Sequence, residues 1–249
     1  MWQRQVDFDG ARDDAIFDVG CVGASASMAL LLLTTALSAP TLWPAPKSAE
    51  SGASTIYITP SQQFFDTSSP SLVLRAAFDR YNALTFPHTT GTEGLLTRLQ
   101  VTVDDSDDSH PQLGTNESYH LEITTRPSAT LTAKTVYGAL RGLETFSQLV
   151  TFDFETETYV IDACPWTITD EPRFAHRGLM VDTARHFQPL ASLKAIVDSL
   201  PYAKINVLHW HLVDTQSFPF HSKSNPKLWD GSYDKHSRYT HSDVSEIVE

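Results

Sequence analysis

Polar side chains follow or end two short strand-like runs in the last third of this chain, at residues 178–182 and 206–214. These side chains are Asp182, Arg185, His186, His209, His211 and Asp214. Carboxylates and imidazoles can move protons or hold a metal ion, and a guanidinium binds oxygen atoms through several N–H groups. The types of residue therefore point to a polar binding or reaction site.

A helix between the two runs would position these side chains. Pro189 opens a segment whose apolar residues recur at helical spacing, namely Leu190, Leu193, Ile196, Val197 and Leu200. Strand, helix and strand in this order form one βαβ step of a parallel sheet. Functional side chains collect at the edge where such strands end, and we expect the carboxylates, Arg185 and His186 there. Pro201 should end the helix at or before Leu200.

His209 and His211 offer a different chemistry, because alternate residues of a strand share one face and such a pair is a familiar seat for a divalent metal ion. Amidohydrolases use a pair of this kind. The sequence shows no third and fourth ligand that would complete the site. We therefore expect no metal ion and no cofactor, and we keep a metal-dependent, amidohydrolase-like barrel as an alternative.

A longer pattern covers both runs. It reads Arg-Gly-Leu-Met-Val-Asp-Thr-Ala-Arg-His-Phe from Arg177 and Ala-Lys-Ile-Asn-Val-Leu-His-Trp-His-Leu-Val-Asp from Ala203, with Ser-Phe-Pro at 217–219. These motifs resemble family 20 glycoside hydrolases, the β-N-acetylhexosaminidases. Upstream, residues 42–46 resemble the start of the mature eukaryotic enzymes, and residues 135–149 resemble the helix that closes their N-terminal domain.

The resemblance implies an α+β N-terminal domain over residues 40–172 and the first part of a TIM barrel over residues 173–249. Only about two barrel strands would fall in this chain, whereas a barrel buries its strands by closing on itself. The helix that begins at the end of the chain has no C-terminal signal. We therefore expect a fragment, with a non-catalytic sugar-binding or dimerising remnant as an alternative.

The chemistry that the resemblance implies is removal of terminal β-linked N-acetylhexosamine by substrate-assisted, retaining catalysis. The 2-acetamido oxygen is the nucleophile, an Asp orients it, and the adjacent Glu is general acid and then base. That Asp-Glu pair belongs to a His-x-Gly-Gly-Asp-Glu motif, which is absent from the 249 residues and is therefore expected beyond Glu249. We expect no catalytic residue in this chain and no activity from the chain alone.

The resemblance also suggests roles for the residues that are present. Arg177 would bind hydroxyls on the far side of the sugar ring, with a structural ion pair as the alternative because Arg177 opens its strand. Asp214 would support the catalytic carboxylates through a later histidine, although Thr215 replaces a second acid that many relatives carry. The residues expected to bind one another and the nearby loops are Asp182, Arg185, His186 and His211.

The N-terminal segment, residues 1–39, is a polar, acidic leader followed by the apolar run 28–37 and small residues. It is typical of a secretory signal processed near Ser38 or Ala39, or of a short membrane anchor over residues 22–37. Asn116 opens an Asn-Glu-Ser sequon for glycosylation. We therefore expect a protein of the secretory pathway that acts outside the cell, at the cell wall, or in a lysosome or vacuole.

The composition of 41% hydrophobic and 19% charged residues is that of an ordinary soluble protein. A net charge of −12 argues against binding to nucleic acid or to an anionic membrane surface. By resemblance, the expected partners are glycans or chitin oligomers that end in N-acetylhexosamine, and a second copy of the full-length protein. Which glycan is the natural substrate does not follow from the sequence.

Residues 40–172 alternate between strand-like and helical patterns. Strands are expected at 55–59, 99–103, 119–124 and 159–163, and residues 164–172 read as a proline-containing linker. One helix should begin with Ser69 as N-cap and Pro70 in the first position, with Leu72, Ala76 and Tyr81 facing inward. A second helix should bury Val136, Leu140, Leu143 and Phe146. The acidic run 104–108 reads as a solvated loop rather than a calcium site.

Overall fold

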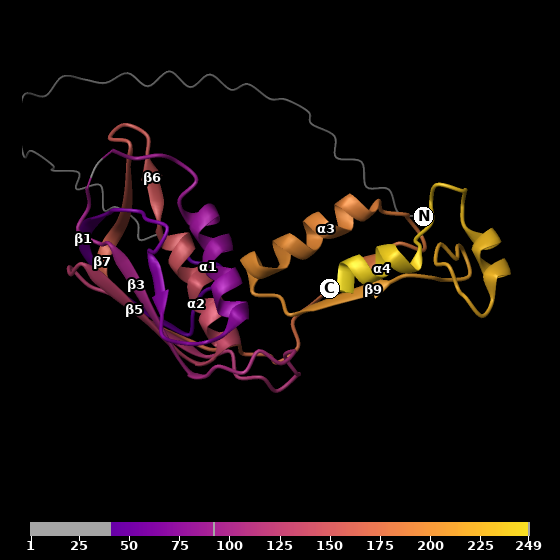
Figure 1. The fold of residues 1–249 in the computed structure, drawn as a ribbon, viewed down its shortest axis with the longest axis horizontal. Helices are drawn as coiled ribbons and strands as arrows, with labels where there is room; N and C mark the ends of the chain where they lie inside the picture. The colour runs from indigo at the N-terminus through magenta and orange to yellow at the C-terminus, as the bar shows by residue number, and fades with distance from the viewer. Residues whose placement is uncertain (1–40, 92, 249) are drawn as a thin grey trace, which may run out of the picture. The chain divides into compact units, whose positions relative to one another are not determined.

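The computed structural model describes residues 41–91 and 93–248. The predicted signal or anchor segment, its processing site, and Glu249, beyond which the catalytic pair is expected, lie outside the described residues. No helix in the described part of the chain is both long enough and apolar enough to cross a membrane. The elements follow the alternation of the sequence: strands with helices between them form the N-terminal region, and one strand–helix–strand unit follows (Figure 1).

A seven-stranded mixed sheet forms the N-terminal region, in the order β1-β7-β4-β5-β3-β2, with β6 paired to β7. The strands β1 (Ser48–Ile58), β7 (Thr158–Asp170), β4 (Tyr119–Ile123) and β5 (Ser128–Thr135) pair antiparallel with one another in this order. The strands β3 (Arg98–Asp105) and β2 (Phe65–Thr67) continue the sheet in parallel from β5. The short β6 (Thr151–Asp153) pairs antiparallel with β7.

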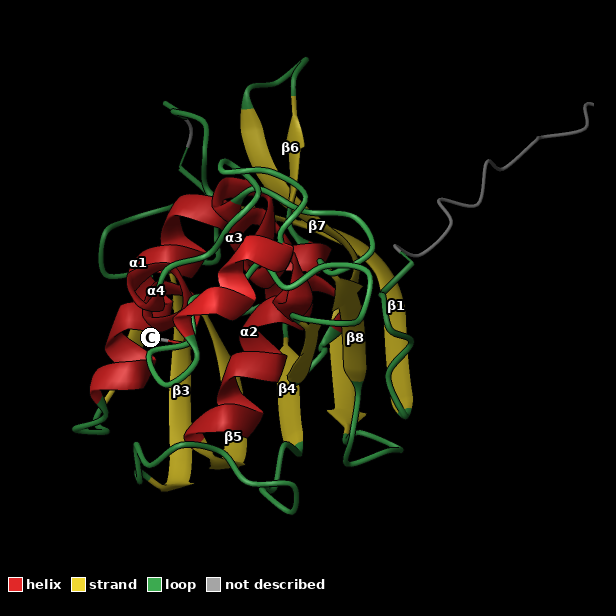
Figure 2. Cartoon of the chain, turned by 90° about the vertical axis from the view of Figure 1, so that its right-hand side faces the viewer, coloured by secondary structure: helices red, strands yellow, loops and turns green. Residues whose placement is uncertain are grey.

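Two helices cover one face of this sheet, as Figure 2 shows for α1 (Leu72–Thr85) and α2 (Val136–Leu149). Alternate strand residues such as Leu99, Leu121 and Leu131 point toward the helices and are fully buried. Residues between them, many of them threonines, stay exposed on the other face. The period of two in the strands therefore places the hydrophobic core between sheet and helices.

The helix α2 confirms its prediction. Val136, Leu143 and Phe146 are fully buried and Leu140 is partly buried against the core. Thr135 is the N-cap, and its side chain accepts a hydrogen bond from the backbone N–H of Gly138 at 3.2 Å. Capping by a threonine satisfies one of the N–H groups that the first turn leaves without a partner.

The helix α1 begins two residues later than predicted. Ser71, not Ser69, is the N-cap and accepts from the backbone N–H of Leu74 at 3.0 Å. Asp108 accepts from the backbone N–H of Leu72 at 2.7 Å, so the acidic run is not only a solvated loop but contributes a second cap. Leu72 is 70% exposed and Ala76 is also exposed, so the prediction that they face inward is wrong, whereas Tyr81 is buried as predicted.

The predicted linker is wrong for most of its length, because residues up to Asp170 continue strand β7. Pairing of β7 with β1 shifts register between Ser51 and Ser54, next to Cys164. Pro165 is exposed and lies at this irregularity. The hydrogen bonds between the strands are already interrupted there, so the missing backbone N–H of proline destabilises the sheet least. A bulge thus lets a proline-containing segment remain in a sheet.

The βαβ unit that follows has the predicted order. Strand β8 (Gly178–Asp182) pairs in parallel with β9 (Val207–His211), and α3 (Leu190–Ser199) connects them. The α-helix ends at Ser199, and a 3-10 turn η1 (Leu200–Ala203) contains Pro201, as the proline predicted. A loop with the 3-10 turn η2 (Pro226–Gly231) leads to α4 (His241–Val248).

Candidate active site

The ends of β8 and β9 bring together four of the predicted residues. Arg185 Nη1 lies 2.8 Å from Asp182 Oδ2, and Arg185 Nη2 lies 2.7 Å from Asp214 Oδ2. His211 Nε2 lies 3.0 Å from the same Asp214 oxygen and 3.1 Å from Arg185 Nη1. One guanidinium therefore joins two carboxylates and an imidazole that come from different strands.

Local backbone geometry sets the position of Arg185. Asp182 Oδ1 accepts hydrogen bonds from the backbone N–H groups of Ala184 at 3.1 Å and Arg185 at 3.0 Å, which closes a tight turn directly after β8. Thr183 donates its backbone N–H to the carbonyl of His211 at 3.1 Å, which ties this turn to β9. The turn directs the Arg185 side chain toward the neighbouring strand.

Both carboxyl groups are held in their charged form. Hydrogen bonds from the Arg185 backbone and side chain lower the pKa of Asp182. The backbone N–H of Thr215 and then the His211 side chain lower the pKa of Asp214, with Arg185 adding to the effect. The paired carboxylates raise the pKa of Arg185 in turn. The cluster can thus orient hydroxyl groups of a ligand, but it holds no protonated acid.

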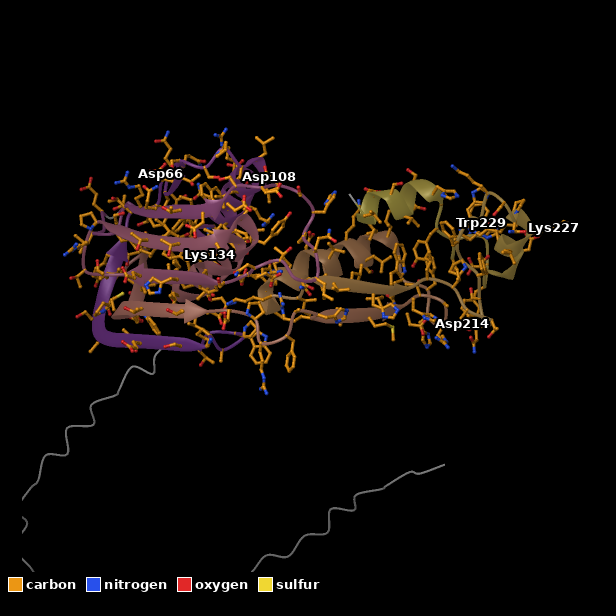
Figure 3. All side chains as sticks on the ribbon, turned by 90° about the horizontal axis from the view of Figure 1, so that it is seen from below. Asp66, Asp108, Lys134, Asp214, Lys227 and Trp229 are labelled. Atoms are coloured by element: carbon orange, nitrogen blue, oxygen red, sulfur yellow. The ribbon has the colours of Figure 1, made fainter. Side chains whose placement is uncertain are left out.

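A cavity of about 550 Å³ borders this cluster. Its lining includes Asp214, Thr215, Phe218 and Lys227, so the loop after β9 forms its wall. Figure 3 shows that Asp214 and the loop residues Lys227 and Trp229 lie at the same end of the region that follows the N-terminal sheet. A polar ligand at this edge of the sheet would meet a carboxylate, an ammonium group and apolar carbon.

The remaining histidines do not join the cluster. The side chains of His186 and His209 are exposed and make no hydrogen bond or ion pair with another described residue. Within residues 41–91 and 93–248, no group of three His, Cys, Asp or Glu side chains is placed to hold a metal ion. The partners of His211 are Arg185 and Asp214, an arrangement that does not favour the amidohydrolase alternative.

Arg177 lies at the opposite end of β8. Its Nε donates to the carbonyl of Lys204 at 2.7 Å, its Nη1 donates to the carbonyl of Phe174 at 2.8 Å, and its Nη2 pairs with the carboxylate of Glu117. The Glu117 side chain is 6% exposed and also accepts from Arg141 Nη2 at 3.1 Å. These contacts fit a structural ion pair, which the sequence analysis kept as the alternative to sugar binding for Arg177.

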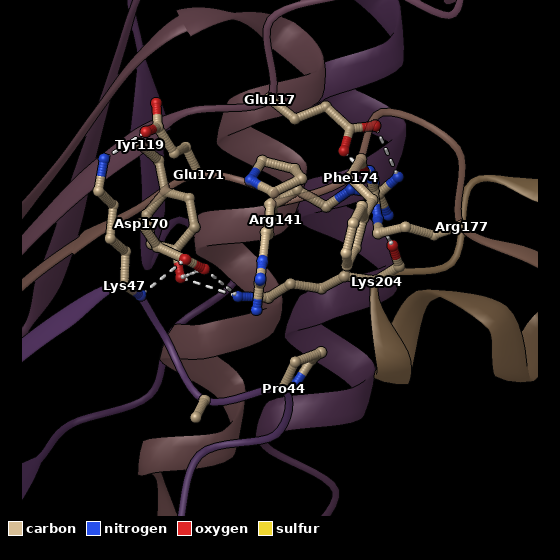
Figure 4. Close-up of a pocket in the computed structure, with 13 residues that line it drawn as sticks. Pro44, Lys47, Glu117, Tyr119, Arg141, Asp170, Glu171, Phe174, Arg177 and Lys204 are labelled. Atoms are coloured by element: carbon tan, nitrogen blue, oxygen red, sulfur yellow. Dashed lines mark hydrogen bonds and ion pairs between the residues drawn. The ribbon is translucent and has the colours of Figure 1, made fainter.

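A second charged group at the same end was missed in the sequence. Lys204 Nζ lies 2.8 Å from Asp170 Oδ2 and 2.9 Å from the hydroxyl of Tyr119, and only 7% of its side chain is exposed (Figure 4). Burial lowers the pKa of Lys204. Burial alone would raise the pKa of Asp170, but the hydrogen bond and charge of Lys204 outweigh burial and lower it. The signal available in the sequence was a single lysine, Lys204, within the mostly apolar residues 200–208.

Two family models match the chain. Residues 42–149 match the model described as "beta-acetyl hexosaminidase like", and residues 174–249 match "Glycosyl hydrolase family 20, catalytic domain". Beta-hexosaminidase 1 of Arabidopsis thaliana is 43% identical, over 88% of this chain and 45% of the relative. Beta-hexosaminidase subunit beta of Homo sapiens is 37% identical, over 84% of this chain and 40% of the relative.

Solved structures give the same result. The chitobiase of Flavobacterium johnsoniae superposes with a TM-score of 0.69 at 29% identity, covering 83% of this chain and 32% of that one. An α+β domain that leads into a TIM barrel is therefore the fold class. The chain spans less than half the length of the curated relatives named above. Because both models describe the same family and together match most of the sequence, the chain belongs to glycoside hydrolase family 20.

Proposed function

We propose that the whole protein is a β-N-acetylhexosaminidase that removes terminal β-linked N-acetylhexosamine from glycans. This chain contributes the N-terminal domain and the first two strands of the barrel. The single observation that carries the proposal is the cluster of Arg185, Asp182 and Asp214 at the C-terminal ends of β8 and β9. In barrels of this kind the reacting groups lie at that edge.

The structure leads us to propose Arg185, rather than Arg177, as the arginine that binds sugar hydroxyls. The side chain of Arg185 is 44% exposed, whereas that of Arg177 is 18% exposed and engaged by Glu117 and two backbone carbonyls. A guanidinium must present N–H groups to a ligand in order to recognise it. Asp214 keeps its proposed role of supporting the catalytic carboxylates, because it holds both Arg185 and His211.

The catalytic step itself depends on groups that we place beyond Glu249, since no His-x-Gly-Gly-Asp-Glu motif occurs in these 249 residues. In substrate-assisted hydrolysis the acetamido oxygen attacks the anomeric carbon while a carboxylic acid protonates the leaving oxygen. The described part of the chain offers only ionised carboxylates at its candidate site. We propose that the chain alone is inactive.

A chimera tests this proposal. The 249 residues are fused to the remaining C-terminal part of Arabidopsis thaliana Beta-hexosaminidase 1, and hydrolysis of 4-nitrophenyl N-acetyl-β-glucosaminide is measured. The chimera should turn over this substrate and the 249-residue chain should not. Activity of the chain alone that disappears in Asp214→Ala would contradict the assignment of the catalytic pair, and a folded but inactive chimera would contradict the proposed function.

We also propose passage through the secretory pathway, with glycosylation at Asn116. The apolar run 28–37 and the surface position of the sequon support this. Asn116 is exposed, and its side-chain oxygen accepts from the backbone N–H and the hydroxyl of Ser118 at 2.9 and 2.6 Å. A mass shift on glycosidase treatment of the secreted protein, absent in Asn116→Gln, tests the modification.

Assembly of two copies of the full-length protein completes the proposal. It rests on the family resemblance, and the human relative is named as a subunit. Sedimentation of the complete protein at micromolar concentration tests it, since a mass equal to that of one chain would contradict dimerisation.

A further inference from the structure

A cavity of about 710 Å³ lies at the N-terminal end of β8, away from the candidate active site (Figure 4). Residues of the N-terminal domain form most of its wall, and Arg177 and Lys204 of the βαβ unit complete it. Its apolar lining comes from Pro44, Ala45, Pro172 and Phe174. A cavity of this size is in the range that holds small organic ligands.

The charges of the wall do not balance. Three cationic side chains, those of Arg141, Arg177 and Lys204, are 14%, 18% and 7% exposed. They face two carboxylates, Glu117 and Asp170, that are 6% and 12% exposed. At the rim, Lys47 pairs with Glu171, and Arg173 forms an ion pair with no described residue. The side chains that line the cavity therefore carry more positive than negative charge, and the buried Glu144 behind the wall offsets part of this excess.

Arg141 has a hydrogen-bond donor left over. Its Nη2 donates to Glu117 at 3.1 Å, but its Nε is buried and has no partner among the described residues. The nearby Glu144 does not line the cavity and accepts from Tyr81 and Gln148 instead. Buried polar groups in folded proteins are nearly always hydrogen-bonded, because a buried donor without an acceptor loses its hydration and gains nothing in return. Arg141 thus makes a single side-chain hydrogen bond with the described residues, which leaves its guanidinium group short of acceptors.

We propose that this cavity binds a small organic acid, with its carboxylate toward Arg141 and its aromatic or alicyclic body against Pro44, Pro172 and Phe174. A carboxylate brings a negative charge and hydrogen-bond acceptors to a guanidinium group that is short of acceptors, and guanidinium–carboxylate bonds are among the stronger hydrogen bonds in proteins. The apolar wall excludes water from the bond and binds the carbon body. This site does not depend on glycoside hydrolysis.

Calorimetric titration of the 249-residue chain at pH 7 tests the proposal with three probes. 2-Naphthoate should bind, and the uncharged 2-naphthamide, which has nearly the same shape, should bind at least tenfold more weakly. Inorganic phosphate should also bind at least tenfold more weakly than 2-naphthoate, because it cannot use the apolar wall. Equal affinity for the acid and the amide, or for phosphate and the acid, would overturn the proposal.

Two variants locate the site. Arg141→Gln should weaken 2-naphthoate at least tenfold while Glu117 keeps its second partner, Arg177. Ala45→Trp should block the cavity without changing any of its charged residues. This variant tests the site independently if Arg141→Gln does not fold. Ala49→Trp is the matched control, since Ala49 is exposed on β1 and does not line the cavity. Undiminished binding by Ala45→Trp, or an equal loss in Ala49→Trp, would place the ligand elsewhere.

Discussion

The replacement Glu117→Gln should destabilise the folded chain more than any exchange of one acid for its amide on the surface. Glu117 is the shared partner of Arg141 and Arg177, whose side chains are 14% and 18% exposed. The amide would keep the shape of the side chain but remove the charge that both guanidinium groups face. Breaking a buried ion pair by removing one partner costs about 3–5 kcal/mol, because the remaining charge stays desolvated. The two arginines keep some contact with water, so we expect a loss at the lower end, about 3 kcal/mol.

Urea unfolding, followed by far-UV circular dichroism at pH 7, measures this loss. With an m-value of about 2 kcal/mol per molar urea, the midpoint should fall by about 1.5 M. The matched control is Glu122→Gln on β4, where the carboxylate is 50% exposed and 3.1 Å from His120. An exposed pair contributes about 0–1 kcal/mol, so the control should scarcely change the midpoint. A Glu117→Gln midpoint within about 0.3 M (about 0.6 kcal/mol) of the Glu122→Gln midpoint would refute the reasoning.

Three further predictions follow from single contacts. Asp108→Ala should lower the urea midpoint, because α1 loses the carboxylate that accepts from the backbone N–H of Leu72; an unchanged urea midpoint would contradict this. The pKa values of Asp182 and Asp214 are lower in the folded chain than their ordinary value of 3.8, so the stability they contribute is complete above that value and is lost as the pH falls through the lower folded values. The urea midpoint should therefore fall between pH 5 and pH 3, and this fall should be smaller in Asp214→Asn. Asp230→Asn changes an exposed residue and serves as the control, which should show the same fall as the unchanged chain. In the active chimera, Arg185→Ala should raise KM at least tenfold, whereas an unchanged KM would remove Arg185 from the list of sugar-binding residues.

Local sequence pattern predicted the elements that depend on local contacts. Apolar residues at helical spacing located α2 and α3, and Pro201 located the end of α3, because the missing N–H acts on the same turn. Strand β5 was missed, since its inward residues Ala129 and Ala133 are small and weaken the alternation on which the prediction depended. The start of α1 was misplaced because its second cap, Asp108, lies 36 residues from Leu72.

The same limit applies to the polar clusters. Asp182, Arg185 and Asp214 were expected together, because parallel strands bring their C-terminal ends to one edge. The buried group of Lys204, Tyr119 and Asp170 was not expected, since Lys204 is 85 residues from Tyr119 and 34 from Asp170. Long-range contacts of this kind are set by the packing of the sheet on the βαβ unit, and no local spacing encodes them.

The two charged groups at opposite ends of β8 and β9 differ in the way that separates a structural role from a ligand-binding role. At the N-terminal end, the Glu117 carboxylate is 6% exposed and every side-chain nitrogen of Arg177 has a protein acceptor. At the C-terminal end, Arg185 is 44% exposed and shares its charge between two ionised carboxylates. A buried charge whose protein partners are fixed exchanges them for a hydroxyl only at high cost, whereas an accessible, shared charge can do so at little cost. This difference supports our proposal that a sugar is recognised at the Arg185 end, whereas at the other end Glu117 joins Arg177, which precedes β8, to Arg141 of the N-terminal domain.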